Sequence, residues 1–539
     1  MSNFLEDKID SIKNGWLVVF IFAASFICCA GYIWRNYGAD ESTFLLLSRM
    51  ATEGVFPVRD YYSQHTPYTV FMHGFLMKLF GFNIYVARTI IYVLSSSIAV
   101  FTYLAVVNAY KRRSAAIICT GLFMVSSLYL FEGSPLESAG HSQTALFFIM
   151  LAMLLSSLPG LSSHSKRFSL YGFSIGICLA AAVWCRSAVL LPAAVIFLNF
   201  IYNVRKNTGR TKNALLASVP AIGGAILGSS LAIYLFFTRP DTFIFCYLKG
   251  SSFYREIVFH PEYGSYIATP WLFRFNVLVD FLRSYGGQTA ILLILFGFAV
   301  LLVAASDGYK RYRAGVILQS LILLAYFVTC VFISRHGFTW HYFGIAVPFL
   351  AIGSAPSIIY WLTAMQKSRV KSLLLTILIL VYFLIGFKAV GGGYKKFITN
   401  IFTKPDIGFE TQASVRKVAD EIIKYTKKDD AILIGSQAPL FVADRRIPNT
   451  LVKSFTIAVI FRIVKDDSYE RHHLISEKKL IQMIDDNEFK LIVDDPYFTP
   501  SLSGGVSDAL KKRYVLEKEI DNDYKVYLPR TAVDQRRIR

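Results

Sequence analysis

Charged side chains are scarce in this 539-residue chain. Only 17% of the residues are Asp, Glu, Lys or Arg, whereas 54% are hydrophobic, and the mean hydropathy is +0.47. A soluble globular domain carries about 25% charged residues. The deficit therefore excludes an ordinary soluble protein and predicts that most of the chain is embedded in lipid. Apolar windows of about 20 residues, the length that crosses a bilayer, give about eleven predicted spans.

Cysteines and glycosylation signals are sparse as well. All seven cysteines precede residue 331, mostly inside apolar runs, which excludes a disulfide framework or a Cys-type zinc site in the C-terminal region. The sequence has no Asn-x-Ser/Thr sequon, which favours a bacterial source. No small-residue cleavage site follows the first apolar segment, 14–34, so we expect this segment to remain as a membrane anchor.

Acidic residues are outnumbered by basic ones, 36 to 56, and the net charge is +20. The basic residues are spread over short loops instead of one patch, so we reject nucleic acid as a partner. They fall in alternate loops, which the positive-inside rule assigns to the cytoplasm. The rule predicts a plasma (inner) membrane protein with a cytoplasmic N-terminus, an extracytoplasmic C-terminal region and an odd number of spans. Clear examples are Lys111-Arg112-Arg113, Lys166-Arg167 and Lys310-Arg311.

The predicted fold class is a polytopic α-helical membrane protein with a C-terminal extracytoplasmic α/β domain. The transmembrane domain covers residues 1–394 and contains two long outer loops, 35–81 and 238–285. After Gly391-Gly392-Gly393 the chain becomes polar, and residues 395–539 have the length of a small domain.

Local patterns predict elements outside the spans. Ala431–Gly435 and Lys490–Asp494 are short apolar runs typical of buried strands, and Val415–Tyr425 has helical spacing. In the first outer loop, Phe44–Leu47 and Val70–Met72 are mixed with polar residues. We expect these stretches to be amphipathic and to lie in the membrane interface.

Two predicted spans, 168–183 and 188–203, are short. Each is roughly 24 Å long against a hydrocarbon core of ~30 Å. They meet at Trp184-Cys185-Arg186-Ser187. Broken helices are tolerated where they line a cavity, so we expect Arg186 to have an anionic partner or an aqueous cavity. The alternative is an arginine that reaches lipid headgroups, as we also expect for Arg88 at the start of the second span.

Asp40 and Glu41 form an acidic pair directly after the first span. They lie on the predicted outer face, where few charges are expected. The loop behind them is too long for a simple connector. A carboxylate in a partly desolvated cleft has a raised pKa, which suits a general base. Taken alone, the pair is equally compatible with a solvated turn at the end of a helix.

Three motifs follow the acidic pair: Gly54-x-x-Pro57, Arg59-Asp60-Tyr61 and His65-x-Pro67. Together with Asp40-Glu41 they resemble the first outer loop of GT-C membrane glycosyltransferases, in the branch of protein O-mannosyltransferases and bacterial aminoarabinose transferases. Looser similarities extend over nearly the whole chain, at Ala87-Arg88, Arg186, Trp340-His341-Tyr342-Phe343, Gly435-Ser-Gln-Ala-Pro439, Ala443-Asp444-Arg445-Arg446 and Asp494-Asp495-Pro496.

The resemblance implies an enzyme that takes a sugar from a polyprenyl-phosphate carrier on the outer face of the membrane. The acceptor is a hydroxyl or amine of a glycan, lipid or protein. The family's catalytic carboxylate maps onto Asp40, which would deprotonate the acceptor in a single inverting displacement. Glu41 would tune Asp40 or position the acceptor.

The resemblance also implies a second acidic residue between the third and fourth spans. Glu132 and Glu137 are both candidates, and His141 follows them. Carboxylates and histidine are ligand types for a divalent cation. No metal-binding motif is present, however, and metal dependence stays open.

Positive charge is needed to hold the leaving phosphate, and a guanidinium can grip phosphate with two hydrogen bonds. The candidate phosphate ligands are Arg59, Arg186, Arg335 and His336. For Arg335 and His336, a place in an ordinary outer turn is an equal alternative. We expect supporting roles, without contact to the reacting atoms, for His65, Tyr61, His141 and Tyr342.

Two other classes of protein are compatible with many spans and an embedded arginine. One is a transporter or flippase of a lipid-linked or anionic substrate, and the other is a non-catalytic assembly factor. A transporter does not explain the acidic pair, the long loop behind it or the outward α/β domain, and no inverted pairing of broken helices is visible. Cleavage of a lipid-linked sugar would distinguish the enzyme from both.

Overall fold

The computed structural model of the chain divides into two compact units. Unit 1 comprises Met1–Ile33, Arg88–Ile233 and Ser265–Lys395, and unit 2 comprises Trp34–Ala87, Tyr234–Gly264 and Lys396–Arg539. Unit 2 thus groups the first outer loop with the C-terminal region. The predicted division at residue 394 had assigned that loop to the transmembrane domain instead. The structure describes residues 12–63, 65–126, 130, 140–157, 166–208, 211–249, 270–330, 343–402, 410–451, 467–496, 498 and 503–533.

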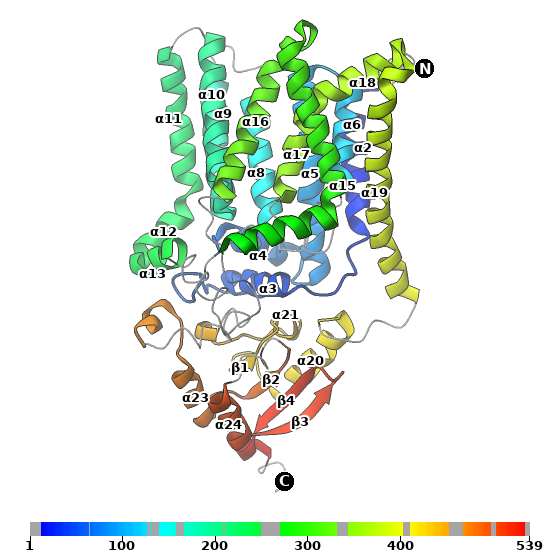
Figure 1. Ribbon diagram of the computed structural model, residues 1–539. Helices are drawn as coiled ribbons and strands as arrows, with labels where there is room; N and C mark the ends of the chain where they lie inside the picture. Colours follow the sequence, from blue (N-terminus) through cyan, green and yellow to red (C-terminus); the bar gives the residue numbers. More distant parts are fainter. Residues whose placement is uncertain are drawn as a thin grey trace. The chain divides into compact units, whose positions relative to one another are not determined.

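Unit 1 is built from helices (Figure 1). Those that run wholly or mostly through it are α2 (Asn14–Ala30), α5 (Ile84–Tyr110), α6 (Arg113–Met124), α8 (His141–Ser156), α9 (Lys166–Cys185), α10 (Leu190–Thr208), α11 (Thr211–Gly228), α15 (Pro270–Ala305), α16 (Arg313–Val328), α17 (Phe343–Gly353), α18 (Ala355–Lys367) and α19 (Arg369–Phe402). The short helices η2 (Ser187–Val189) and η5 (Asp307–Tyr312) connect some of them, and α12 (Ser230–Thr238) runs from unit 1 into unit 2.

The helices of unit 1 have the length and composition of membrane spans. Among the described residues, five helices are long and apolar enough to cross a membrane, or seven if each of two bent helix pairs is one span. Shorter apolar helices of 10–17 residues, such as Asn14–Ala30 and His141–Ser156, accompany them. The chain is therefore a multi-pass membrane protein. The predicted number of eleven spans stays a prediction.

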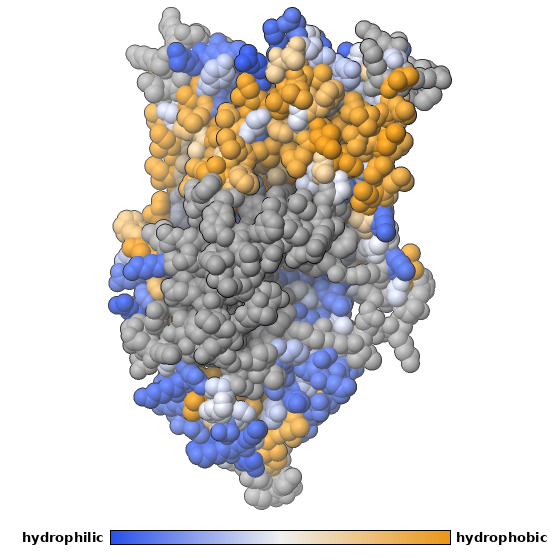
Figure 2. Space-filling view, in the orientation of Figure 1, coloured by the Kyte–Doolittle hydropathy of each residue, from blue (hydrophilic) through white to orange (hydrophobic). Residues whose placement is uncertain are grey.

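The outer surface of these helices is apolar, as the broad hydrophobic band in Figure 2 shows. On α19, the side chains of Val370, Leu374 and Leu384 are 83%, 68% and 68% exposed. Apolar surface of this extent is costly in water but not against hydrocarbon. The helices thus present a face that matches lipid.

The predicted break at Arg186 is confirmed. Helix α9 ends at Cys185, the short turn η2 follows, and α10 begins at Leu190. Arg186 itself has extended backbone, with φ −156° and ψ 112°. The break therefore places one arginine between two apolar helices.

Helices α9 and α11 lie side by side (Figure 1) and approach closely. A Cβ atom on Gly176 of α9 would lie 1.9 Å from the carbonyl oxygen of Ala221, and one on Gly224 of α11 would lie 2.0 Å from that of Phe173. Only glycine fits at these two positions, as in other close helix pairs in membranes.

Two helices extend beyond their predicted limits. Helix α19 continues through Gly391-Gly392-Gly393 to Phe402, where the sequence predicted a change of domain. A Cβ on Gly393 would lie 2.8 Å from the ring of Tyr32, so glycine serves helix packing here and not chain termination. Helix α15 begins at Pro270, inside the predicted loop 238–285. Proline suits the first turn of a helix. The charged residues that follow it lower the mean hydropathy of this stretch, so a hydropathy window does not detect the helix.

The first outer loop contributes two helices to unit 2, α3 (Ala39–Thr52) and α4 (Tyr68–Phe80). They pack so closely that a Cβ on Gly74 would lie 2.4 Å from the carbonyl oxygen of Ser48. Phe44–Leu47 are only 0–4% exposed, so this stretch is core and the prediction of an interfacial segment was wrong for it. Packing within the protein, which includes α4, covers these apolar side chains, which the sequence pattern assigned to the membrane interface. Helix α4 does expose Phe75, Leu79 and Phe80.

The C-terminal part of unit 2 contains a four-stranded sheet in the order β1-β2-β4-β3. Strands β1 and β2 are parallel, whereas β4 is antiparallel to both β2 and β3. Both predicted strands and the predicted helix are confirmed. The elements are β1 (Ile432–Ile434), β2 (Leu491–Asp494), β3 (Tyr514–Ile520), β4 (Tyr524–Pro529), α20 (Gln412–Tyr425), α21 (Ala438–Ala443), α23 (Glu477–Asp485) and α24 (Gly504–Arg513), as Figure 1 shows. Unit 2 also contains α13 (Pro240–Ile244), η3 (Phe245–Lys249), η8 (Asn449–Leu451) and η9 (Asp467–His472).

Local sequence explains where these elements begin and turn. The hydroxyls of Thr411, Ser476 and Ser503 each accept the backbone N–H three residues later, at 3.2, 3.3 and 3.2 Å, and so cap α20, α23 and α24. The hairpin β3–β4 was not predicted. Its turn has Asp521 and Asn522 at φ 54° and 60°, and these residue types tolerate that conformation.

Candidate active site

The acidic pair lies in the first turn of α3. Gly38 is the N-cap, Asp40 is the second helical residue and Glu41 is the third. The Glu41 carboxylate accepts the backbone N–H of Gly38 at 3.4 Å, which satisfies a donor at the start of the helix. The helix dipole favours negative charge at this end. The structure describes the backbone of Asp40 but not its side chain.

Glu41 forms a buried ion pair with Arg35. The distance from Nη2 of Arg35 to Oε1 of Glu41 is 3.1 Å, and the two side chains are 6% and 2% exposed. A buried pair is tolerated only when its geometry is good and its charges stay together. The predicted helper of Asp40 is thus engaged in fixing the chain that leads into α3.

Arg59 is bound within its own loop. Its guanidinium lies 2.6 Å from the carboxylate of Asp60, donates to the carbonyl of Gly54 and stacks on the ring of Phe56 at 4.3 Å. These contacts favour a structural role over phosphate binding. Burial tends to raise the pKa of Asp60, but the hydrogen bonds from Arg59 and from the Phe56 N–H outweigh it, and the pKa lies below its usual range.

Tyr61 and His65 support the same loop. Tyr61 is fully buried, its carbonyl accepts the N–H of Val58 at 2.8 Å, and burial raises the pKa of its hydroxyl. The ring of His65 lies edge-on to that of Phe44 of α3, with 5.0 Å between centroids. Both residues make contacts within this loop or between it and α3. Their supporting roles at the site stay a prediction.

The beginning of the predicted outer loop 238–285 packs on the first outer loop. Val58, Tyr62, Phe245, Cys246 and Leu474 form one apolar cluster, in which the rings of Tyr62 and Phe245 lie 5.9 Å apart. Three segments distant in sequence are thereby brought together within unit 2.

The structure brings Arg186 and His141 together in unit 1. The guanidinium of Arg186 donates to the hydroxyl of Ser142 in the first turn of α8, and Nδ1 of His141 lies 3.1 Å from the carbonyl oxygen of Cys185. Gln143, the next residue of α8, is fully buried, and neither polar atom of its amide has a hydrogen-bond partner among the described residues.

Several predicted site residues lie outside the described residues: Glu132, Glu137, Arg335, His336 and Tyr342. Within the described part of the chain, no group of three or more His, Cys, Asp or Glu side chains could hold a metal ion. Metal binding by the predicted acidic residues stays an open expectation.

Sequence reasoning missed the role of Arg35 and was wrong about the surroundings of Arg88. Arg35, the partner of Glu41, belongs to no motif and lies on an irregular stretch before α3. Arg88 was expected to reach the membrane surface, but it is fully buried and donates to the carbonyl of Ile33 at 2.6 Å. Neither contact has the residue spacing of a helix or a strand, so no local sequence pattern predicts either of them.

No protein-family model matches the chain, and no curated protein sequence does. Solved structures do match. The crystal structure of ArnT from Cupriavidus metallidurans, bound to undecaprenyl phosphate, has a TM-score of 0.59 and 13% identity, over 96% of this chain and 98% of that one.

Two further structures are similar at lower scores. The oligosaccharyltransferase of Archaeoglobus fulgidus, in complex with Zn and sulfate, has a TM-score of 0.49 and 14% identity, over 95% of this chain and 73% of that one. The arabinosyltransferase EmbB of Mycobacterium smegmatis has a TM-score of 0.38 and 14% identity, over 65% and 31%. The agreement with ArnT extends over nearly the full length of both chains. It is an agreement of fold, because few residues are shared. The chain has the fold of the GT-C membrane glycosyltransferases, the family that its motifs resemble.

Proposed function

We propose that the protein is a membrane glycosyltransferase that transfers a sugar from a polyprenyl-phosphate donor to a cell-envelope acceptor. The observation that carries this proposal is the full-length match to ArnT, whose crystal structure holds undecaprenyl phosphate. The acidic pair at the start of α3, in the loop whose motifs resemble the family's first outer loop, supports the same function.

In the proposed reaction, Asp40 is the general base. The acceptor hydroxyl or amine attacks the anomeric carbon of the donor sugar, and its proton passes to the Asp40 carboxylate. The bond from the anomeric carbon to the phosphate oxygen breaks, and polyprenyl phosphate leaves. A single displacement of this kind inverts the configuration of the sugar. The first turn of a helix favours an ionised carboxylate, which is the form that a base requires.

The leaving phosphate needs positive charge, and Arg186 is the best-supported candidate. It lies at a break between helices and donates to Ser142 in the first turn of α8. Guanidinium and helix N-termini both favour phosphate. Arg59 is less suited because of its contacts with Asp60 and Gly54. Arg335 and His336 stay candidates, as do Glu132 and Glu137 for a divalent cation.

We place the reaction on the outer face of the inner membrane, with the N-terminus in the cytoplasm, because the basic loops alternate along the chain. The absence of an Asn-x-Ser/Thr sequon favours a bacterial source. A glycan, lipid or protein can serve as the acceptor in this setting.

The proposal is tested with the purified protein in liposomes that contain radiolabelled polyprenyl-phosphate sugars and an envelope extract as acceptor. We expect release of free polyprenyl phosphate together with labelled acceptor. A flippase, the alternative function, would move the labelled lipid across the bilayer without cleaving it. Mass spectrometry of surface glycans with and without the gene would then identify the acceptor.

A further inference from the structure

Helix α3, which begins with the acidic pair, ends in contacts with the C-terminal part of unit 2, Lys396–Arg539, which we call the C-terminal domain. Arg49 in its last turn is 8% exposed. Its Nη1 atom donates to the carbonyl oxygen of Phe441 at 2.8 Å and lies 3.1 Å from the carboxylate of Asp444. Its guanidinium also stacks on the rings of Phe441 and Phe82, at 4.7 and 5.2 Å. Because Phe441 belongs to α21, Arg49 satisfies a carbonyl at the C-terminal end of that helix.

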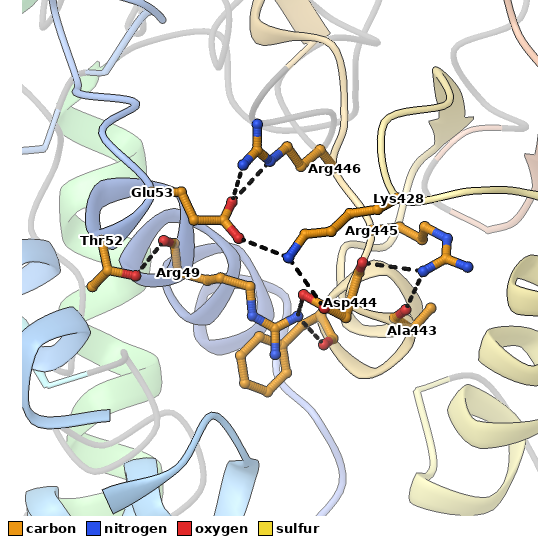
Figure 3. Close-up of polar contacts among 9 residues, drawn as sticks. Arg49, Thr52, Glu53, Lys428, Ala443, Asp444, Arg445 and Arg446 are labelled. Carbon is orange, nitrogen blue, oxygen red and sulfur yellow. Dashed lines mark hydrogen bonds and ion pairs between the residues drawn. The ribbon is translucent and has the colours of Figure 1, made fainter. Parts of the chain in front are cut away.

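A second contact involves Glu53, the C-cap residue of α3. Its carboxylate accepts from Nε and Nη2 of Arg446, both at 2.8 Å, and lies 3.3 Å from Nζ of Lys428. Lys428 in turn lies 3.3 Å from Asp444. Figure 3 shows these side chains converging from the end of α3 and from the C-terminal domain. We call Arg49, Glu53, Lys428, Asp444 and Arg446 the charge network. Its signs alternate from one member to the next, so each charge has an opposite neighbour.

The segment that precedes α3 also forms hydrogen bonds with the C-terminal domain. The backbone N–H of Tyr37 donates to the carbonyl of Glu410 at 3.0 Å, and the side chain of Gln412 donates to the carbonyl of Arg35 at 3.3 Å. Arg35 is the ion-pair partner of Glu41. Residues of the C-terminal domain thus hold the chain just before α3 as well as the end of the helix.

From these contacts we propose that the C-terminal domain positions α3, and with it Asp40, for sugar transfer. The charge network sets the direction of the helix, and Arg49, Glu53 and Arg446 are positioning residues. This inference rests on the proposed function. A helix of 14 residues is about 21 Å long, so a tilt of about 10° about its end displaces its first turn by about 4 Å. A misplacement of about 1 Å can lower a rate about 10²-fold.

The test compares charge reversals in the full-length protein. Arg446→Glu faces Glu53 with a like charge, and the double variant E53R/R446E restores opposite charges. The matched control is Arg513→Glu, which breaks the ion pair with Asp485 in the same domain, on α24. We expect R446E to lower kcat about tenfold or more with the KM for the donor within about twofold. E53R/R446E should recover part of the loss, because the new cation at position 53 also faces Lys428 with a like charge. R513E should stay within about twofold of wild type.

A double-mutant cycle with Asp40→Asn separates positioning from a general loss of folded protein. If the network acts through Asp40, R446E lowers the residual rate of D40N by less than about twofold. Loss of folded protein would lower it by the same factor as in the wild type. The proposal is overturned if R446E lowers the rate of D40N by the same factor as it lowers the rate of the wild type. It is also overturned if R513E lowers the wild-type rate as much as R446E does.

Hydrogen exchange of the substrate-free protein gives a readout that does not depend on activity. We expect R446E to raise amide exchange in Ala39–Thr52, and R513E to leave it unchanged. Unchanged exchange in R446E overturns the anchoring of α3. A wild-type protein without transfer activity, but with the expected difference in exchange, would overturn the proposed function and leave the anchoring in place.

Discussion

At the residue scale, the two members of the acidic pair have different surroundings. Glu41 is buried with Arg35, and a carboxylate in such a pair is not available to take a proton from an acceptor. Asp40 is next to it in sequence, in the first turn of α3. Glu41 is therefore held in local structure, and Asp40 is the member of the pair that we propose as the base.

Substitutions distinguish these roles. We expect Asp40→Asn to lower turnover about 10²–10⁴-fold, because a lost general base has an effect of this size, with little change in thermal stability. Glu41→Gln should destabilise the protein by about 3 kcal/mol, because it removes the charge partner of buried Arg35. Transfer assays and thermal unfolding in detergent measure both effects. The double variant R35M/E41L, which replaces the pair by apolar side chains, should recover stability. Near-wild-type turnover in D40N would remove Asp40 from the base position.

Arg186 is tested by binding and not by rate alone. Arg186→Ala should weaken donor binding about tenfold or more, because a charged group that grips phosphate is lost. Arg186→Lys should lose less, since it keeps the charge but not the two-pronged geometry. Equilibrium binding of a polyprenyl phosphate to the purified protein measures this. Unchanged affinity in the alanine variant would take Arg186 out of the phosphate site.

At the scale of elements, helix contacts depend on small residues and on buried polar groups. Glycines allow α9 and α11 to touch backbone to backbone. Helix α4 packs on α3 through Gly74 and carries His73, which is 3% exposed. These contacts lead to two predictions.

Gly176→Ala should destabilise unit 1 strongly, because its Cβ would lie 1.9 Å from the carbonyl oxygen of Ala221 and the two helices would have to separate. Gly223→Ala on α11 is the matched control, since nothing lies within 4 Å of a Cβ there. We expect overpacking to cost about 1–3 kcal/mol or more in the first variant and no loss in the second. Thermal unfolding and the yield of monodisperse protein report the difference. Equal behaviour of the two would contradict the close contact.

Stability should fall in mild acid. Burial lowers the pKa of His73 to about 4, from an unfolded value near 6.5. Between these values the unfolded chain binds the additional proton, so stability decreases as the pH falls from about 6.5 towards 4. The full effect is on the order of 3 kcal/mol. Thermal unfolding across this range should show a shallower decline for His73→Gln. Some decline of stability with falling pH is expected to remain in the His73→Gln variant, because burial also lowers the pKa of His472 and the pKa of His473.

At the scale of the whole molecule, a lipid-matching helical unit and a unit with a sheet belong to one chain with the GT-C fold. The distribution of basic loops predicts how this chain crosses the membrane. Reporter fusions test the prediction. A fusion after Arg205-Lys206 should be active only as a cytoplasmic reporter, and one at the C-terminus only as an extracytoplasmic reporter. A cytoplasmic C-terminus would contradict the odd number of spans.

Much of this organisation could be predicted from composition and short-range patterns. The apolar spans, the break at Arg186, the strands Ile432–Ile434 and Leu491–Asp494 and the helix ending at Tyr425 all follow from periodicity within some twenty residues. The continuation of α19 through its glycines was missed, because a glycine that packs against Tyr32 looks the same in sequence as one that ends a helix.

The sequence by itself determined that the protein resides in a membrane, that an acidic pair follows its first apolar segment, and which family the loop behind that pair resembles. Only the tertiary structure decided that Glu41 pairs with Arg35, that Phe44–Leu47 are core, and that Arg49 and Glu53 meet Asp444 and Arg446. The reason is physical. Hydropathy and periodicity act over one element, whereas Arg49 and Glu53 meet partners nearly 400 positions away only when the chain folds. Arg35 meets Glu41 from an irregular stretch, to which no spacing rule applies.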